Sequence, residues 1–166
     1  MDTGIRKGNP NDAENIAKVH IESWKTTYKG IIDAQYLDDL SLEDKIVKWE
    51  NILQDKDIVV YVAEKNNTII GFIALEKLKK EIHGHDGLIS SLYILEQYQR
   101  MNIGNRLFKE AMEYLKILQC KKILVWVLKE NPSKHFYEKM GGVFLIEEEM
   151  KIGINKYIEC AYSWRI

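Results

Sequence analysis

Hydrophobic positions along the chain recur with helical and with alternating spacing, and the changes between the two predict a mixed order of elements. A short strand is predicted at residues 3–7. Between residues 13 and 28 the apolar positions roughly follow the spacing of one helix face, and Asn9-Pro10 supplies cap and first-turn residues. A second helix is predicted from Ser41, which opens a capping-box-like Ser-x-x-Asp pattern, through Leu53.

The middle and end of the chain predict the strands of a sheet. Residues 58–64 and 68–78 are two strands joined by a turn at Asn66-Asn67, which is typical of a hairpin. The further elements, in order, are a strand at 88–94, an amphipathic helix at 104–119, a buried strand at 122–127, a short helix from Asn131-Pro132 to Gly141-Gly142, and strands at 143–151 and 157–164.

This order, β-α-α-β-β-β-α-β-α-β-β, indicates one sheet with helices on its faces. Parallel pairing is most favoured around the two helices that begin near Gly104 and Pro132, because a helix can cross over between parallel strands. The fold class is α/β or α+β, since periodicity alone does not separate them.

Composition narrows the function classes. With 166 residues and no linker, the chain is expected to be one domain, 1–166. Its 24 Lys and Arg balance 25 Asp and Glu and are interspersed, which argues against nucleic acid as a partner. No signal peptide and no apolar run of about 18–20 residues is present, so no membrane partner is expected. Cys120 and Cys160 lie far apart, which favours a reduced, cytoplasmic protein.

The strongest candidate site lies in residues 92–108, where a strand runs through a polar turn directly into a helix. Free N–H groups at a helix start bind anions, and Arg100 and Arg106 add positive charge. Gly104 permits close backbone approach, and Asn102 tolerates left-handed dihedral angles. An ordinary strand–turn–helix with solvated arginines is the alternative.

A second candidate segment, residues 131–142, is a short capped helix with Phe136-Tyr137 one turn before its end. By residue type alone, a tyrosine such as Tyr137 is more often a packing residue with a solvent-exposed hydroxyl than a catalytic residue.

Together these segments resemble the GNAT superfamily of acyl-CoA-dependent N-acyltransferases. Gln99-Arg100-Met101-Asn102-Ile103-Gly104 is similar to the family's pyrophosphate loop, Q/R-x-x-G-x-G/A, and residues 131–142 are similar to its second CoA motif, N-P-x-x-x-F-Y-x-K-x-G. Further matches lie at 24–32, 36–40, 69–72 and 161–164, so the resemblance covers essentially the whole chain.

The resemblance implies a single mixed, mostly antiparallel sheet whose central strands splay to admit acetyl-CoA, with no metal. It implies direct acetyl transfer to a primary amine of a small molecule or peptide, with both substrates bound. Tyr137 would protonate the departing thiolate, and a backbone N–H near Ile94 would stabilise the oxyanion. The implied CoA-binding residues are Leu92, Tyr93, Ile94, Gln99, Arg100, Met101, Asn102, Ile103, Gly104, Asn105, Arg106, Asn131, Ser133 and Phe136.

Two departures from the family pattern stand out. Asn102 replaces the first loop glycine, and we expect weakened but not absent CoA binding. Leu88 replaces a glutamate that often serves relatives as general base, which leaves Asp86 as the nearest carboxylate for a base or water relay. His83 and His85 next to Asp86 could suggest a metal site, but no third ligand follows at a recognisable spacing.

The acceptor pocket of this family is usually lined by the first helices and the last strands. The tentative substrate-lining residues are therefore Trp24, Tyr28, Tyr36 and Tyr157. The acidic run at 147–149 could attract a cationic amine, and a solvated strand end explains it equally well. A homodimer is a further expectation from relatives.

Two rival functions compete with this one. A non-catalytic acyl-CoA-binding module of the same fold is the main alternative, motivated by Asn102 and Leu88. A dehydrogenase or P-loop NTPase is set aside because neither glycine motif occurs.

Overall fold

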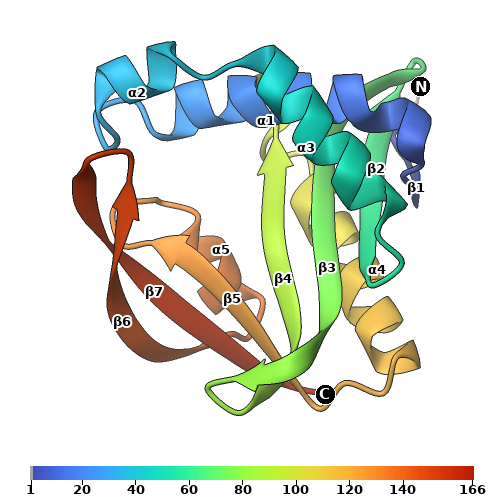
Figure 1. The fold of residues 1–166 in the computed structure, drawn as a ribbon. Coiled ribbons are helices and arrows are strands. Elements are labelled where there is room, and N and C mark those ends of the chain that lie inside the picture. Colours follow the sequence, from blue (N-terminus) through green and yellow to red (C-terminus); the bar gives the residue numbers. More distant parts are fainter. Residues whose placement is uncertain (1) are drawn as a thin grey trace.

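A seven-stranded sheet runs through residues 2–166, the part of the chain that the computed structural model describes (Figure 1). The strands are β1 (Gly4–Lys7), β2 (Ile58–Lys65), β3 (Thr68–Ile82), β4 (His85–Ile94), β5 (Lys122–Leu128), β6 (Val143–Ile152) and β7 (Asn155–Arg165). The α-helices are α1 (Ala13–Thr27), α2 (Ala34–Asp38), α3 (Leu42–Gln54), α4 (Ile103–Ile117) and α5 (Lys134–Lys139), with 3-10 turns η1 (Pro10–Asp12) and η2 (Glu96–Tyr98).

The strand order is β1-β2-β3-β4-β5-β7-β6, and every neighbouring pair is antiparallel except β4 and β5. The predicted mixed, mostly antiparallel sheet is therefore confirmed, as is parallel pairing around the helix near Gly104. Direct parallel pairing around the helix near Pro132 is wrong. The hairpin strand β7 inserts between β5 and β6 and satisfies the backbone groups of both.

Helices cover both faces of the sheet. On one face, Phe72 of β3 packs against Trp49 of α3, with ring centroids 4.9 Å apart, and α1 lies over the same strands. On the other face, Phe108 of α4 contacts Phe136 of α5 and Trp164 of β7. Figure 1 shows α1 and α3 crossing one side of the sheet, with α4 on the opposite side. We refer to these as the α1 face and the α4 face.

Several local signals in the sequence produce the expected structure. Asn9 and Asp12 form a reciprocal capping box before α1, and the Ser41 hydroxyl accepts the Asp44 N–H at the start of α3. Asn66 and Asn67 both have positive φ, as a two-residue hairpin turn requires. The short helix α2 was not among the predicted elements, because five residues are too few to show helical periodicity.

The two central parallel strands pair over only three residues each. Gly87 to Ile89 of β4 match Ile123 to Val125 of β5, and beyond this point no pairing joins the strands. Ser90 is an extra residue in β4 relative to β3, since Ile89 pairs with Leu75 while Ser91 pairs with Ala74. Such a bulge bends a strand. The result is an open gap in the middle of the sheet, in agreement with the predicted splaying.

None of the helices within residues 2–166 is long and apolar enough to cross a membrane.

Candidate active site

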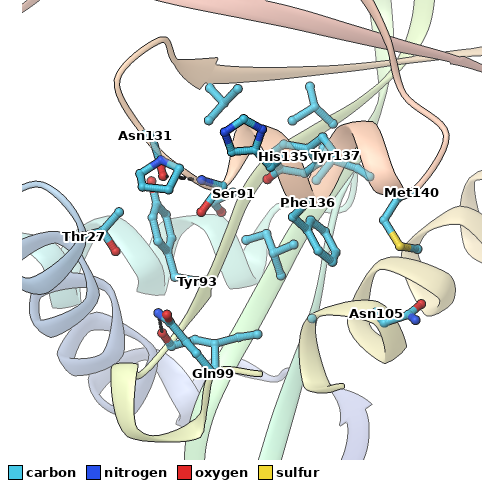
Figure 2. Close-up of a pocket in the computed structure, with 18 of the residues that line it drawn as sticks. Thr27, Ser91, Tyr93, Gln99, Asn105, Asn131, His135, Phe136, Tyr137 and Met140 are labelled. Atoms are coloured by element: carbon cyan, nitrogen blue, oxygen red, sulfur yellow. Dashed lines mark hydrogen bonds between the residues drawn. The ribbon is translucent and has the colours of Figure 1, made fainter. Parts of the chain in front are cut away.

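A cavity of about 790 Å³ occupies the gap between β4 and β5. Its lining includes Thr27, Tyr28 and Trp126 on the α1 face, and Asn105, Phe136 and Met140 on the α4 face. The cavity therefore passes through the sheet. Figure 2 shows side chains from β4, the α4 loop and α5 converging on this space. Such a passage allows two different ligands to meet inside the protein, one from each face.

The turn before α4 presents a row of backbone N–H groups to the cavity. The first intrahelical bond of α4 runs from Arg106 N–H to the Asn102 carbonyl, so the N–H groups of Ile103, Gly104 and Asn105 have no helical acceptor. Arg100 and Asn102 adopt left-handed backbone conformations, with φ of 61° and 63°. This alternation around Met101 forms the kind of concave N–H nest that binds anions.

Gly104 lies at a narrow place between the start of α4, β4 and α5. A Cβ there would lie 3.2 Å from the Ile94 side chain and 3.6 Å from the Phe136 ring. The absence of a side chain thus keeps open the narrow space between the start of α4 and β4. Gln99 fixes the other end of the turn, because its Nε2 donates to the Ile94 carbonyl at 3.0 Å.

The β4 wall offers backbone groups as well as side chains. Leu95 N–H donates to the Ile70 carbonyl of β3. Because residues of an antiparallel strand point their backbone groups alternately to either side, those of Leu92 and Ile94 point away from β3 and into the gap. The N–H groups of Leu92 and Ile94 therefore face the cavity as hydrogen-bond donors.

The opposite wall is built by the turn after β5 and by α5. Buried Asn131 accepts the Ser133 N–H at Oδ1, which shapes the start of the helix. Gly141, with φ of 90°, ends the helix as predicted. Tyr137 is buried, lines the cavity and packs against Tyr162 and Trp164. Burial raises the pKa of its hydroxyl well above the usual value, so Tyr137 stays protonated at neutral pH.

Most of the predicted CoA-binding residues come together in this cavity. The exceptions are Met101 and Arg106, whose side chains are exposed and do not line it. Residues of β5 line the cavity but had no motif of their own, because a buried strand has the same apolar sequence whether or not its neighbour splays away. Those residues are Val125, Trp126 and Val127.

The four tentative substrate-lining aromatic residues separate into two groups. Tyr28 lines the cavity, while Trp24 packs behind it with ring centroids 4.9 Å apart. Tyr36 and Tyr157 lie outside the cavity lining. Tyr157 accepts the Asp33 N–H at 3.0 Å, and Tyr36 covers Gly153 of the β6–β7 turn. These two tyrosines thus tie the α1–α2 segment to the last hairpin.

Asp86 lies at the paired end of β4 and does not line the cavity. Its carboxylate accepts the backbone N–H groups of Lys121 and Lys122 at 2.9–3.0 Å, which fixes the start of β5. Partial burial opposes the charged form, but these donors outweigh it and lower the pKa of the carboxyl. The structure therefore gives Asp86 an anchoring position rather than one from which a base could reach a substrate in the cavity.

We expect Asp86→Ala to lower the free energy of unfolding by about 2 kcal/mol at pH 7, because two N–H groups lose a charged acceptor. Since the folded-state pKa is below the unfolded value of about 3.9, this stabilisation is full above that pH and disappears as the pH falls through the folded-state pKa. Urea unfolding at pH 7 and pH 2.5 measures the difference. An equal difference at both pH values would contradict the anchoring role.

The two histidines next to Asp86 are engaged in separate contacts. His83 Nε2 meets Glu148 at 2.7 Å. Buried His85 lies between the His83 carbonyl and the Ser163 hydroxyl, at 2.7 and 2.6 Å. Over residues 2–166, no group of three or more His, Cys, Asp or Glu side chains is arranged to hold a metal ion.

Comparisons with known proteins agree with this architecture. Residues 20–142 match the family model described as the acetyltransferase (GNAT) family. The chain is 29% identical over 160 residues to the uncharacterized N-acetyltransferase YuaI of Bacillus subtilis, covering 96% of this chain and 91% of that protein. It is 31% identical over 160 residues to a spermidine N(1)-acetyltransferase of Thermoplasma acidophilum, covering 89% of this chain and 91% of the relative.

A solved structure has the same fold over the full length of both chains. It is the PaiA N-acetyltransferase of Thermoplasma acidophilum in complex with coenzyme A, with a TM-score of 0.74 and 23% identity. The family model spans most of the chain, including the loop before α4 and the segment through α5. The protein therefore belongs to the GNAT acetyltransferase family.

Proposed function

We propose that the protein transfers an acetyl group from acetyl-CoA to a primary amine by direct attack, with both substrates bound at once. The observation that carries this proposal is the cavity that crosses the sheet between β4 and β5. Acetyl-CoA would enter from the α4 face and the amine from the α1 face. The experiment is to incubate the protein with acetyl-CoA and a panel of amines, and to follow thiol release together with the mass of the acetylated product.

The α4 face suits coenzyme A. The N–H nest from Arg100 to Asn105 would hold the pyrophosphate, and the Leu92 and Ile94 backbone would hold the pantetheine arm. The fold of PaiA, solved with coenzyme A bound, supports this placement. Exposed Arg106 would add charge beside the phosphates, whereas exposed Met101 would contribute only its backbone.

The residues of the cavity fit the chemical steps of amide formation. The neutral amine attacks the thioester carbon, the C–N bond forms, and the carbonyl oxygen becomes negative, where the Ile94 N–H group would stabilise it. The C–S bond then breaks. Tyr137 would donate its hydroxyl proton to the departing sulfur and recover a proton from the amine nitrogen, so that the products are the amide and free CoA thiol.

Neither cysteine supports a covalent acyl-enzyme. Cys120 and Cys160 are buried outside the cavity lining, and burial raises the pKa of each thiol. These two free thiols also support a reducing, cytoplasmic setting.

The α1 face favours a cationic acceptor such as a polyamine. Glu159 of β7 lies directly opposite Glu148 of β6, on the same face as Trp126, which lines the cavity. Two like charges in this position destabilise a sheet unless something compensates; His83 meets Glu148, whereas the Glu159 carboxylate makes no hydrogen bond or ion pair within residues 2–166. Burial and then Glu148 raise the pKa of Glu159. A second ammonium group of the substrate would relieve this repulsion, and the spermidine acetyltransferase relative supports the choice.

We expect Glu159→Gln to raise KM for spermidine about tenfold with little change in KM for acetyl-CoA, because one charge contact to the amine is lost. Glu149→Gln is the matched control, since Glu149 lies on the opposite face of β6 and pairs with Lys156. Steady-state kinetics with both substrates measures the effect. Equal changes in the two variants would rule out a role for Glu159 in acceptor binding.

One observation favours the alternative of a non-catalytic acyl-CoA-binding module. Among the described residues that line the cavity there is no carboxylate, since Leu88 stands where relatives often have glutamate and Asp86 faces away. Binding of acetyl-CoA without product from any amine would support this alternative.

We also propose a homodimer through the edge strand β6. Four consecutive apolar residues at its start, Val143 to Ile146, are 37–68% exposed on a strand with one unpaired edge. Light scattering tests this expectation, and a monomer at micromolar concentration would contradict it.

A further inference from the structure

Three polar side chains from three elements form a hydrogen-bonded chain at the α1 side of the cavity. Tyr28 at the end of α1 lies between the other two. Its hydroxyl oxygen is 3.3 Å from the Tyr93 hydroxyl of β4 and 3.3 Å from Asn131 Nδ2, which follows β5. All three residues line the cavity, and Figure 2 shows Tyr93 and Asn131 on its wall.

Not all of the hydroxyl protons in this hydrogen-bonded group of side chains have acceptors in the protein. Asn131 Nδ2 can only donate, so the Tyr28 oxygen accepts from it. Tyr28 and Tyr93 carry two hydroxyl protons, and one of them lies in the bond between the two oxygens. Within residues 2–166, no other acceptor is hydrogen-bonded to either hydroxyl, and Trp24 Nε1, which lies near Tyr93, can only donate. Whichever tyrosine donates to the other, one phenolic proton is left without an acceptor.

Both hydroxyls keep their protons at neutral pH. Burial raises the pKa of Tyr28 and raises the pKa of Tyr93 well above its ordinary value. The pair is therefore a neutral donor in the cavity, and a donor that is buried without an acceptor costs free energy until a ligand supplies one.

We propose that the Tyr28–Tyr93 pair donates a hydrogen bond to the carbonyl oxygen of the acyl group of acyl-CoA. The proposal rests on the proposed function. An ammonium substrate brings only donors, and the single lone pair of a neutral amine must face the carbon that it attacks. The thioester carbonyl is the acceptor that gains negative charge during the reaction, so a donor aimed at it stabilises the transition state.

The pairing makes the two hydroxyls redundant. In Tyr93→Phe, Tyr28 still accepts from Asn131 and its own proton becomes free. In Tyr28→Phe, Tyr93 keeps a free proton. Only the double variant removes both phenolic protons. We therefore expect small effects from each single variant and a larger effect from the double variant than the two combined.

The test measures binding and does not require a known amine. The dissociation constants of acetyl-CoA and of S-ethyl-CoA, which lacks only the carbonyl oxygen, are determined by calorimetry. The unaltered chain, both single variants and Y28F/Y93F are compared, with Tyr61→Phe as a control tyrosine of β2 outside the cavity. We expect the preference for acetyl-CoA to fall about tenfold in the double variant and less than threefold in the others. Affinity for S-ethyl-CoA should not change.

Other outcomes of this experiment distinguish a failure of the inference from a failure of the proposed function. An unchanged preference in the double variant would overturn the inference and leave the proposed function standing. Equal loss of affinity for both compounds would also overturn it, because the tyrosines would then only shape the cleft. If the unaltered chain bound neither compound, the proposed function itself would fail together with the inference.

Discussion

Tyr137→Phe is expected to lower kcat about a hundredfold while acetyl-CoA affinity changes less than twofold. The variant removes one buried hydroxyl that lines the cavity and keeps the ring that packs against Tyr162 and Trp164. General acid catalysis contributes about 10²–10⁴ in rate, and the expected loss lies at the lower end because burial raises the pKa of Tyr137 and makes it a weaker acid.

Tyr162→Phe is the matched control for this variant. Its hydroxyl donates to Glu138 at 2.7 Å and does not line the cavity, so the same chemical change should leave kcat almost unaltered. Steady-state kinetics and calorimetric titration with acetyl-CoA give the two quantities. Parallel losses in kcat and in affinity, or no loss in either, would remove Tyr137 from the role of acid.

Asn102→Val should weaken acetyl-CoA binding by at least tenfold, whereas Asn102→Gly should bind as well as the unaltered chain or better. Asn102 has φ of 63° immediately before α4. Asparagine tolerates this left-handed conformation, glycine adopts it freely, and a β-branched residue is strongly disfavoured there. Valine would therefore pull the backbone out of the nest geometry and turn N–H groups away from the pyrophosphate.

The comparison at one position separates backbone conformation from side-chain contact. The Asn102 side chain makes no capping hydrogen bond to α4, so neither variant loses such a bond. Calorimetry gives the affinities, and circular dichroism checks that α4 still forms. Weak binding by both variants would show that the amide side chain, not the backbone, is what matters at Asn102.

The sequence was sufficient for the parts of the structure that local chemistry determines. Caps such as Asn9 and Ser41, the Asn66-Asn67 turn and the glycines after α5 located element ends within a few residues. The left-handed backbone of Asn102 agrees with the expectation that asparagine tolerates this conformation in place of the family's loop glycine. The cavity brought together most of the side chains that the two motifs had suggested.

Features set by packing between distant segments could not be predicted in this way. The place of β7 between β5 and β6 depends on which edge the last hairpin meets. Strand alternation placed Asp86 on one face with Ser90, but the bulge at Ser90 and the N–H groups of Lys121 and Lys122 decide where Asp86 lies. The hydrogen bonds among Tyr28, Tyr93 and Asn131 join residues up to 103 positions apart, and no spacing pattern in the sequence predicts them.

Calorimetric titration of the purified protein with acetyl-CoA, and separately with NADH and ATP, tests the central claim most directly. The gap between β4 and β5 and the N–H nest before α4 predict one acetyl-CoA bound per chain, with no comparable binding of the two nucleotides. Failure to bind acetyl-CoA, or equal binding of all three compounds, would contradict the assignment of this cavity to an acyl-CoA substrate.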